Sequence, residues 1–318
     1  MNTSPLRVTV VGSGYMGKGI AHTLARGGAV VTLADREPDI AAAALEAMIE
    51  DVRVAEDRGL VPAGSVDQVR AGSTAGASIE AAVAGADLVV EAVFEDIAVK
   101  HAVLKVIEEA TGDDTVITTN TSAIPVSDLA AVLRRPQRFF GVHWFNPAPY
   151  LPAIEVILGS ESDESLLAPV TELLVASGKA PVVVADTPGF ICNRLQFALF
   201  KEAALMVEEG TATAERIDGV VRSSFGFRLP FFGPFAIADM AGLDVYANSY
   251  TTLEAQLGPR FTCPPSLRSR VDTGDLGIKT GGGYLGLTAE ESAAMTERRD
   301  RSYVALATLR DSLESSDD

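Results

Sequence analysis

The sequence predicts an α/β domain built on a doubly wound parallel sheet, followed by an all-helical C-terminal domain. Segments typical of strands and of helices alternate over residues 6–185, as they do in parallel sheets whose two faces are covered by helices. The first of these strands runs straight into a glycine-rich turn. From residue 187 onward the strand signal fades and helical patterns follow one another. We therefore expect two domains, residues 1–186 and residues 187–318.

The glycine-rich turn has the pattern of a dinucleotide-binding site. It follows a β-branched strand at residues 6–11 and opens an amphipathic helix, and a second strand follows at residues 29–34. In such a site the first glycine permits the tight turn, the second lets backbone N–H groups approach the pyrophosphate, and the third lets helix and strand pack closely. The N-terminus of the helix adds partial positive charge for the phosphates. The sequence thus predicts a Rossmann-type cofactor site that includes Gly12, Gly14, Tyr15, Met16 and Gly17.

The second strand ends at Asp35, which indicates the kind of dinucleotide. A carboxylate at this place accepts hydrogen bonds from the adenosine ribose. Its charge would repel a 2′-phosphate, so the sequence favours NAD over NADP. Arg36, the next residue, is the one feature that works against this preference.

The next elements extend the same alternation. Helices are predicted at residues 40–59, 65–71 and 97–110, and strands at residues 86–93 and 115–119. Three polar residues, Glu95, Ser122 and His143, fall just past predicted strand ends. Ligands in parallel sheets bind at these carboxyl ends, so we expect the three side chains to lie near a ligand.

The segment from residue 139 to residue 155 contains a candidate general base. His143 lies in one apolar run and Glu155 in the next, and Asn146-Pro147-Ala148-Pro149 predicts a sharp turn between them. Chain reversal at this turn would bring the imidazole and the carboxylate together, and such a pair can act as a base with its tautomer fixed. The alternative is a core histidine and an unrelated edge-strand glutamate.

The C-terminal part is predicted to be helical at residues 190–209, 213–224, 233–257 and 288–312. It is rich in Phe, Leu and Ala. Helical domains of this composition often pair with a second copy, so we expect a homodimer.

Composition excludes several classes of partner. A net charge of −17 argues against nucleic acid and against an anionic membrane surface. No apolar run approaches the length of about 20 residues that spans a membrane, and the N-terminus lacks the pattern of a signal peptide. The two cysteines lack metal-ligand spacing, so we expect no metal site and a cytoplasmic protein.

With these residues in view, the chain resembles the L-3-hydroxyacyl-CoA dehydrogenase family, which includes 3-hydroxybutyryl-CoA dehydrogenases, over nearly its whole length. The resemblance implies a Rossmann-type domain joined to an all-helical dimerisation domain, NAD as cofactor, and a role in fatty acid metabolism. The motifs that carry it occur in the family's order and spacing: VTVVGSGYMGKGIA (8–21), DLVVEAVFEDIAVK (87–100), TNTSAI (119–124), GVHWFNPAPYLPAIEV (141–156), DTPGFICNRL (186–195), GPFAIADMAGLDVY (233–246) and LGIKTGGGY (276–284).

The resemblance also implies catalytic roles. His143 and Glu155 match the pair that takes the proton of the substrate's 3-hydroxyl while a hydride leaves for the nicotinamide. The family's assisting serine and asparagine fall on Ser122 and Asn193, which would also bind the substrate. Both side chains can hydrogen-bond an oxygen that changes from alkoxide to ketone. Taken alone, Asn193 could instead be a polar residue at a helix start.

Further cofactor contacts carry over to four more residues: Glu95, Lys100, Asn146 and Lys279. Each stands in its motif. Taken alone, either lysine could be a solvated surface charge.

Two departures from the family concern the substrate. An ungapped count from Asp35 puts the family's CoA-contacting serine on Asp51 and its contacting lysine on Arg58. Arginine can still bind a phosphate, but Glu50-Asp51 and Glu56-Asp57 place acidic groups where the phosphates of CoA should lie. Pro152 also stands in a loop where acyl-CoA enzymes usually have a Met-Lys-Leu pattern, and it looks more like relatives that act on carnitine or sugar acids. The segment 233–244, by contrast, looks like the acyl-CoA branch.

Three hypotheses follow. The first is an NAD-dependent dehydrogenase that acts on a small-molecule substrate, a 3-hydroxyacyl-CoA. The second keeps the cofactor and the His–Glu pair but acts on a small hydroxy acid, carnitine-like or sugar-acid, or on a carrier-tethered acyl group. The third is a redox-inactive NAD-binding structural protein, against which the complete set Ser122, His143, Glu155 and Asn193 argues.

Overall fold

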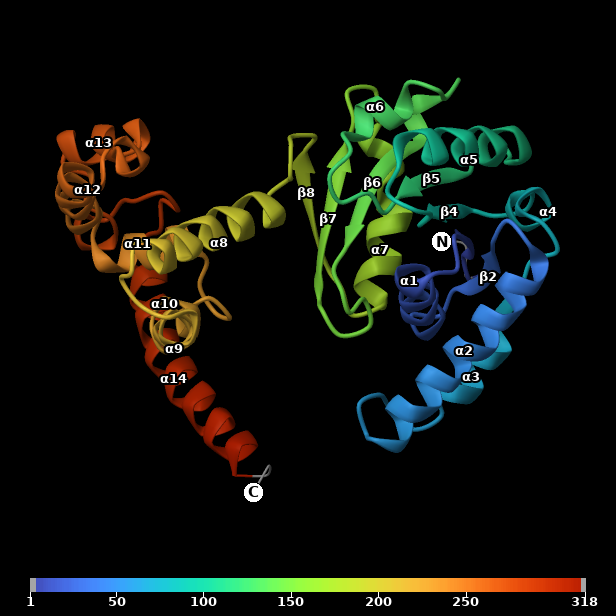
Figure 1. Cartoon of the computed structure of the whole chain (residues 1–318), viewed down its shortest axis with the longest axis horizontal. Coiled ribbons are helices and arrows are strands. Elements are labelled where there is room, and N and C mark those ends of the chain that lie inside the picture. The colour runs from blue at the N-terminus through green and yellow to red at the C-terminus, as the bar shows by residue number, and fades with distance from the viewer. Residues whose placement is uncertain (1–3, 316–318) are drawn as a thin grey trace. The chain divides into compact units, whose positions relative to one another are not determined.

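The computed structural model describes residues 4–315, and the chain divides into two compact units, Met1–Leu199 and Phe200–Asp318 (Figure 1). The division falls within helix α8 (Cys192–Glu208). The sequence places the domain boundary earlier, at residues 186–187, and this placement stays a prediction.

The first unit is built on one eight-stranded sheet with the order β3-β2-β1-β4-β5-β6-β7-β8. All neighbouring strands pair in parallel except β6 and β7, so the last two strands run opposite to the others. The strands are β1 (Arg7–Val11), β2 (Val30–Ala34), β3 (Ser73–Ala75), β4 (Leu88–Glu91), β5 (Val116–Thr119), β6 (Phe139–Trp144), β7 (Ala153–Leu158) and β8 (Ala180–Ala185).

Helices cover both faces of this sheet, as the sequence predicts. One hydrophobic core joins the sheet to four helices and a second core joins it to three, and residues from β1 enter both: Val8 and Val10 the first, Val11 the second. Strands buried on both faces read as continuous apolar runs, which is the pattern seen in the sequence. The first core holds α1 (Tyr15–Arg26), α2 (Pro38–Asp57), α3 (Ser65–Gly72) and α7 (Ala168–Ala176), and the second holds α4 (Ile79–Val83), α5 (Ile97–Ala110) and α6 (Val126–Ala130).

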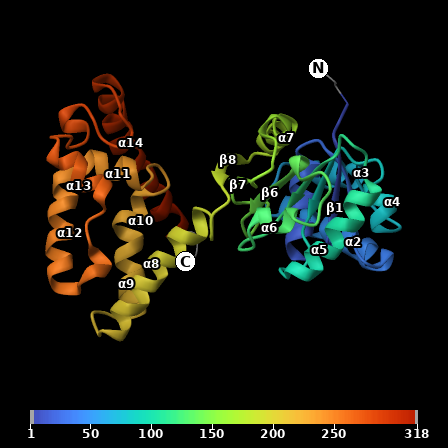
Figure 2. The same cartoon turned by 90° about the horizontal axis from the view of Figure 1, so that it is seen from above.

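The second unit is helical within the residues that the structure describes, and Figure 2 shows its helices gathered side by side. It contains the rest of α8 and then α9 (Ala214–Ser223), α10 (Phe225–Arg228), α11 (Pro234–Ala241), α12 (Leu243–Leu257), α13 (Pro265–Asp272) and α14 (Ala289–Glu314). Short 3₁₀ turns complete the chain: η1 (Pro136–Arg138), η2 (Glu164–Leu166), η3 (Pro259–Phe261) and η4 (Ile278–Thr280).

The prediction of a single helix at residues 233–257 is wrong, because Gly242 divides this segment into α11 and α12. This glycine has φ 104°, a conformation outside the helix, and its N–H closes α11 on the carbonyl of Ala238. A Cβ at this position would lie 2.8 Å from both Asp244 Oδ1 and Lys279 Nζ. The break therefore needs glycine both for its φ angle and for the close approach of these charges.

The sequence does not predict several short elements, because each spans too few residues for its periodicity to stand out: β3, α4, α6, α7 and α13.

Over residues 4–315, no helix combines the length and the apolar character that crossing a membrane requires.

Candidate active site

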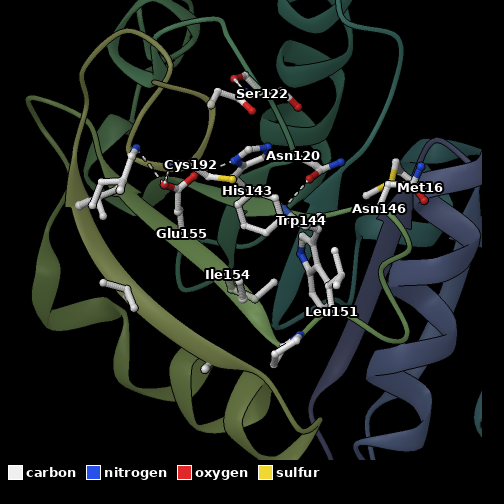
Figure 3. Close-up of a pocket in the computed structure, with 18 of the residues that line it drawn as sticks. Met16, Asn120, Ser122, His143, Trp144, Asn146, Leu151, Ile154, Glu155 and Cys192 are labelled. Carbon is white, nitrogen blue, oxygen red and sulfur yellow. Dashed lines mark hydrogen bonds and ion pairs between the residues drawn. The ribbon is translucent and has the colours of Figure 1, made fainter. Parts of the chain in front are cut away.

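His143 and Glu155 face each other across neighbouring antiparallel strands. They are directly opposed in the register of β6 and β7, and His143 Nδ1 lies 2.8 Å from Glu155 Oε2 (Figure 3). Both side chains are buried, at 4% and 8% exposure. A carboxylate only accepts hydrogen bonds, so Nδ1 donates the proton and the lone pair is left on Nε2. The predicted turn thus brings the two residues together, in the tautomer that a base needs.

The second oxygen of Glu155 is held by the start of α8. Oε1 accepts the backbone N–H groups of Ile191 and Cys192, each at 2.9 Å. Phe190, just before them, has φ 49° in the left-handed region, which is strained for a residue with a Cβ. Its ring also packs 5.7 Å from the imidazole of His143. This strained turn fixes the carboxylate and the imidazole in one arrangement.

Cys192 lies in the same turn, and its environment disfavours the thiolate. Burial raises the pKa of its thiol, and the nearby charge of Glu155 raises it further. A thiol of this kind is mainly protonated at neutral pH and is a weak nucleophile. We therefore assign Cys192 a packing role.

Ser122 and Asn193 meet at the same cavity. Asn193 Nδ2 donates to the backbone oxygen of Ser122 at 2.9 Å, so the two residues are tied together although they are far apart in the sequence. The hydroxyl of Ser122 has no hydrogen-bond partner within residues 4–315 and can therefore bind a ligand oxygen.

The cavity that these residues line has a volume of about 820 Å³ and lies at the carboxyl ends of β5 and β6. Its walls are largely apolar, with Trp144, Phe145 and Leu151 among them. No lysine or arginine lines it within the described part of the first unit. Its polar side chains mainly carry hydroxyl, imidazole and carboxamide groups and belong to Asn120, Ser122, His143, Asn146, Asn193 and Gln196. The carboxylate of Glu155 also lines the cavity.

A second cavity of about 640 Å³ lies at the carboxyl ends of β1, β2 and β4, and it is lined by Gly12, Gly14 and Asp35. It shares Tyr15 and Met16 with the first cavity, so one extended ligand can reach both. A Cβ added at Gly14 would meet no atom within 4 Å, which leaves the backbone open to a phosphate. A Cβ at Gly17 would lie 1.8 Å from the carbonyl oxygen of Gly12, so this position needs glycine for close packing. The cradle fits a dinucleotide.

Asp35 is anchored to the glycine-rich turn. Its Oδ2 accepts the N–H and the hydroxyl of Ser13 at 2.8 and 2.7 Å, and its Oδ1 accepts the N–H of Arg36 at 2.8 Å. Burial alone would raise the pKa of this carboxyl, but the hydrogen bonds hold it below its usual value. The ionised carboxylate keeps acceptor capacity on Oδ1 for a ribose hydroxyl.

Glu95 and Lys100, for which the resemblance implies contacts with the cofactor, are paired with each other. Lys100 is fully buried, and its ammonium donates to Glu91 at 2.9 and 3.1 Å and pairs with Glu95 at 3.3 Å. In this arrangement the ammonium faces Glu91 and Glu95, and its direct contact with the cofactor stays a prediction. Glu95 Oε1 in turn accepts the N–H groups of Ser122 and Ala123 at 2.8 and 3.1 Å, and so fixes the turn that carries Ser122.

The three other predicted binding residues lie on different elements of the chain. Asn146 lines the main cavity on the side of Met16 (Figure 3). Arg58 is exposed at the end of α2, and no ion pair joins it to another described residue. Lys279 belongs to the second unit, where it pairs with Asp244.

Lys179 is a residue that the sequence does not single out. It is buried, and its ammonium donates to the carbonyls of Ala148 and Leu151 at 2.5 and 2.8 Å. It also lies 5.6 Å from the ring of Trp144. Burial, and to a lesser degree the charge of Arg26, lowers the pKa of this lysine. Lys179 thus holds the turn between β6 and β7 through these hydrogen bonds. In the sequence, no short-range signal distinguishes it from a surface lysine.

The chain matches the model of the 3-hydroxyacyl-CoA dehydrogenase NAD-binding domain over residues 7–187 and that of the C-terminal domain over residues 189–286. It is 37% identical to a 5-formyl-3-hydroxy-2-methylpyridine 4-carboxylate 5-dehydrogenase of Mesorhizobium japonicum, over 95% of this chain and 97% of that protein. It is 36% identical to a probable 3-hydroxybutyryl-CoA dehydrogenase of Bacillus subtilis, over 87% of this chain and 96% of that protein.

Solved structures give the same picture. A 3-hydroxyacyl-CoA dehydrogenase of Archaeoglobus fulgidus aligns with a TM-score of 0.77 and 33% identity, over 96% of this chain and 99% of that one. A 5-formyl-3-hydroxy-2-methylpyridine 4-carboxylic acid 5-dehydrogenase, described as an NAD+-dependent dismutase, aligns with a TM-score of 0.71 and 35% identity, over 96% and 98%.

Proposed function

This chain belongs to the 3-hydroxyacyl-CoA dehydrogenase family of NAD-dependent oxidoreductases, and we propose that it interconverts a 3-hydroxyacyl-CoA and its 3-oxoacyl-CoA with His143 as the general base. The observation that carries the proposal is the buried His143–Glu155 pair in a cavity that shares Tyr15 and Met16 with the dinucleotide cradle.

In the proposed reaction, His143 Nε2 takes the proton of the 3-hydroxyl, and the C3 hydrogen leaves with its electron pair. NAD, when bound, supplies the acceptor for that hydride. Glu155 stabilises the imidazolium that forms, and the N–H groups of the α8 turn keep its own charge in place. The hydroxyl of Ser122 and the carboxamide of Asn193 bind the oxygen as it becomes a ketone.

No lysine or arginine stands among the described first-unit residues that line the cavity, and this favours the thioester over a free acid. A carboxylate substrate would lie near Glu155 with no lysine or arginine from the described first unit to balance it. Such a charge pair is costly in a site that excludes water. A thioester carries no charge next to its carbonyl.

A second candidate, a small substrate without CoA, is favoured by helix α2. Asp51 pairs with Lys18 at 3.4 Å, and Arg53 pairs with both Glu50 and Asp57. Among the described residues of α2 and its C-cap, Arg58 is thus the one cation without an ion pair that could bind the phosphates of CoA. The Mesorhizobium japonicum relative is named for a pyridine carboxylate. The acids on α2 are exposed, however, and salt screens exposed charges over about 8 Å. We therefore give more weight to the cavity than to the helix.

The two candidates differ in a direct assay. We expect NADH consumption with acetoacetyl-CoA, slower turnover with the acetoacetyl thioester of N-acetylcysteamine, and very little with free acetoacetate. Arg58→Ala should raise KM for the CoA thioester and leave KM for the short thioester unchanged, because only CoA carries phosphates. Turnover of free oxo acids in preference to both thioesters would replace the first candidate by the second.

We also propose a cytoplasmic homodimer that acts in fatty acid metabolism. The second unit exposes large apolar side chains on several helices, which is typical of a protein interface: Phe200, Val220, Phe235, Val245 and Val304. Both cysteines are free, in keeping with a reducing compartment. One chain has a mass of 33.3 kDa, and sedimentation velocity should give twice this mass. A monomer at micromolar concentration would reject the dimer.

A further inference from the structure

Asn120 is a lining residue of the main cavity to which neither the sequence nor the resemblance gives a role. It follows directly after β5, and its backbone N–H donates to the carbonyl of Glu91 at 2.8 Å. Its side-chain oxygen accepts the backbone N–H of Trp144 at 2.9 Å. Both the main chain and one half of the side chain are therefore fixed.

The hydrogen bond from Trp144 determines which way the carboxamide faces. Only the oxygen can accept an N–H, so the NH₂ group lies on the opposite side. Within residues 4–315 this NH₂ group has no acceptor. Figure 3 shows Asn120 between His143 and the side of the cavity where Met16 and Asn146 lie, with its nitrogen toward that side. The structure thus aims two N–H donors at one region of the cavity.

This region is where the two cavities connect. Met16 lines both the dinucleotide cradle and the main cavity. A dinucleotide with its adenosine beside Asp35 must pass Met16 to bring its nicotinamide within reach of a substrate held at His143. The free donors of Asn120 face this route.

We propose that Asn120 binds the cofactor by donating a hydrogen bond to the carboxamide oxygen of the nicotinamide; this rests on the proposed function. A neutral carbonyl that enters an apolar cavity needs a donor to replace water. A single directed donor also fixes the rotation of the ring, so that one face of the nicotinamide is presented to C3 of the substrate.

A structural role and a binding role of Asn120 use different atoms, so substitutions can separate them. Holding Trp144 needs only the oxygen, which Asn120→Asp keeps. Binding the cofactor needs the NH₂ group, which Asn120→Asp and Asn120→Ala both remove. The reduced 3-acetylpyridine analogue of NAD is a suitable probe, since its acetyl group accepts hydrogen bonds and cannot rotate to donate one to the new carboxylate.

The measurement is the affinity for this analogue and for ADP-ribose, which lacks the nicotinamide. The chain's single tryptophan, Trp144, lies in the cavity and reports binding of the reduced ring by energy transfer; ADP-ribose is followed by competition. We expect both variants to bind the analogue about tenfold more weakly and to bind ADP-ribose as the unchanged chain does. The same exchange at the exposed Asn248, Asn248→Asp, should change neither affinity.

Two results would overturn the proposal. If Asn120→Asp binds the analogue normally and only Asn120→Ala fails, Asn120 merely holds Trp144. If both ligands weaken equally, the contact lies on the ribose or the cavity has collapsed. Neither result depends on turnover, so a failure of the substrate assignment leaves these affinities measurable and stays distinguishable from a failure at Asn120.

Discussion

Replacing His143 by alanine should lower kcat/KM for the preferred hydroxyacyl substrate by about 10²- to 10⁴-fold, the usual contribution of general acid–base catalysis. The affinity for NADH should stay unchanged, because the imidazole lies beside Glu155 and away from the dinucleotide cradle. Stopped-flow turnover and NADH titration would measure the two quantities on one preparation. Activity close to that of the unchanged chain would refute the mechanism.

Glu155→Gln provides the matched test of the carboxylate. The glutamate accepts three hydrogen bonds, from His143 Nδ1 and from the N–H groups of Ile191 and Cys192. A glutamine has one oxygen and must turn its NH₂ group toward one of these donors, so either the imidazole or the α8 turn loses its partner. We expect kcat to lie between that of the unchanged chain and that of His143→Ala. The double variant should be little worse than His143→Ala alone, since residues that act as a unit are not additive. Additive losses would show that the two side chains act separately.

The His143–Glu155 pair could be predicted because all of its causes are local. Two apolar runs and a proline-containing turn lie within one segment of the chain, and an antiparallel pairing then sets the register. The same holds for the glycine-rich turn and Asp35, where one strand, one helix and the next strand form the whole site. These parts of the fold could be predicted because the residues that form them are close together in the sequence.

The parts that could not be predicted depend on contacts between distant segments. Glu155 is held by backbone groups of Ile191 and Cys192, and Lys179 reaches back to the carbonyls of the turn before β7. Asn120 acquires its orientation only when β6 lies beside β5. None of these residue types is unusual where it stands in the sequence. Their significance comes from the packing of the sheet.

Lys100 is a residue whose motif predicts its role but whose burial the sequence does not predict. Its motif predicts a contact with the cofactor, but pattern alone does not tell whether an ammonium is exposed. The fold places it against Glu91, whose side chain is 0% exposed, so the lysine neutralises a buried charge. Gly242, in contrast, could have been read from the sequence, because an isolated glycine in a helical pattern is a known site of interruption.

Asp35→Asn should relax the preference for NAD over NADP, because it removes the charge that repels a 2′-phosphate. A hydrogen bond to a charged group contributes about 1.5–3 kcal/mol, so we expect the ratio of KM values for the two cofactors to change by about 10- to 100-fold. Two effects combine in this ratio. The loss of a charged acceptor weakens NAD binding, and the exposed guanidinium of Arg36 can attract the phosphate of NADP without an opposing carboxylate beside it.

The choice of asparagine keeps the glycine-rich turn in place, since its oxygen can still accept the N–H of Ser13. Ser13→Ala is the control: it removes one hydrogen bond to Asp35 and leaves the charge, so it should weaken both cofactors to a similar extent without changing their ratio. Adding Arg36→Ala to Asp35→Asn should remove the gain in NADP binding while NAD stays weak. If the ratio is insensitive to Asp35→Asn but shifts with Ser13→Ala, selectivity comes from the shape of the turn, and the carboxylate does not carry it.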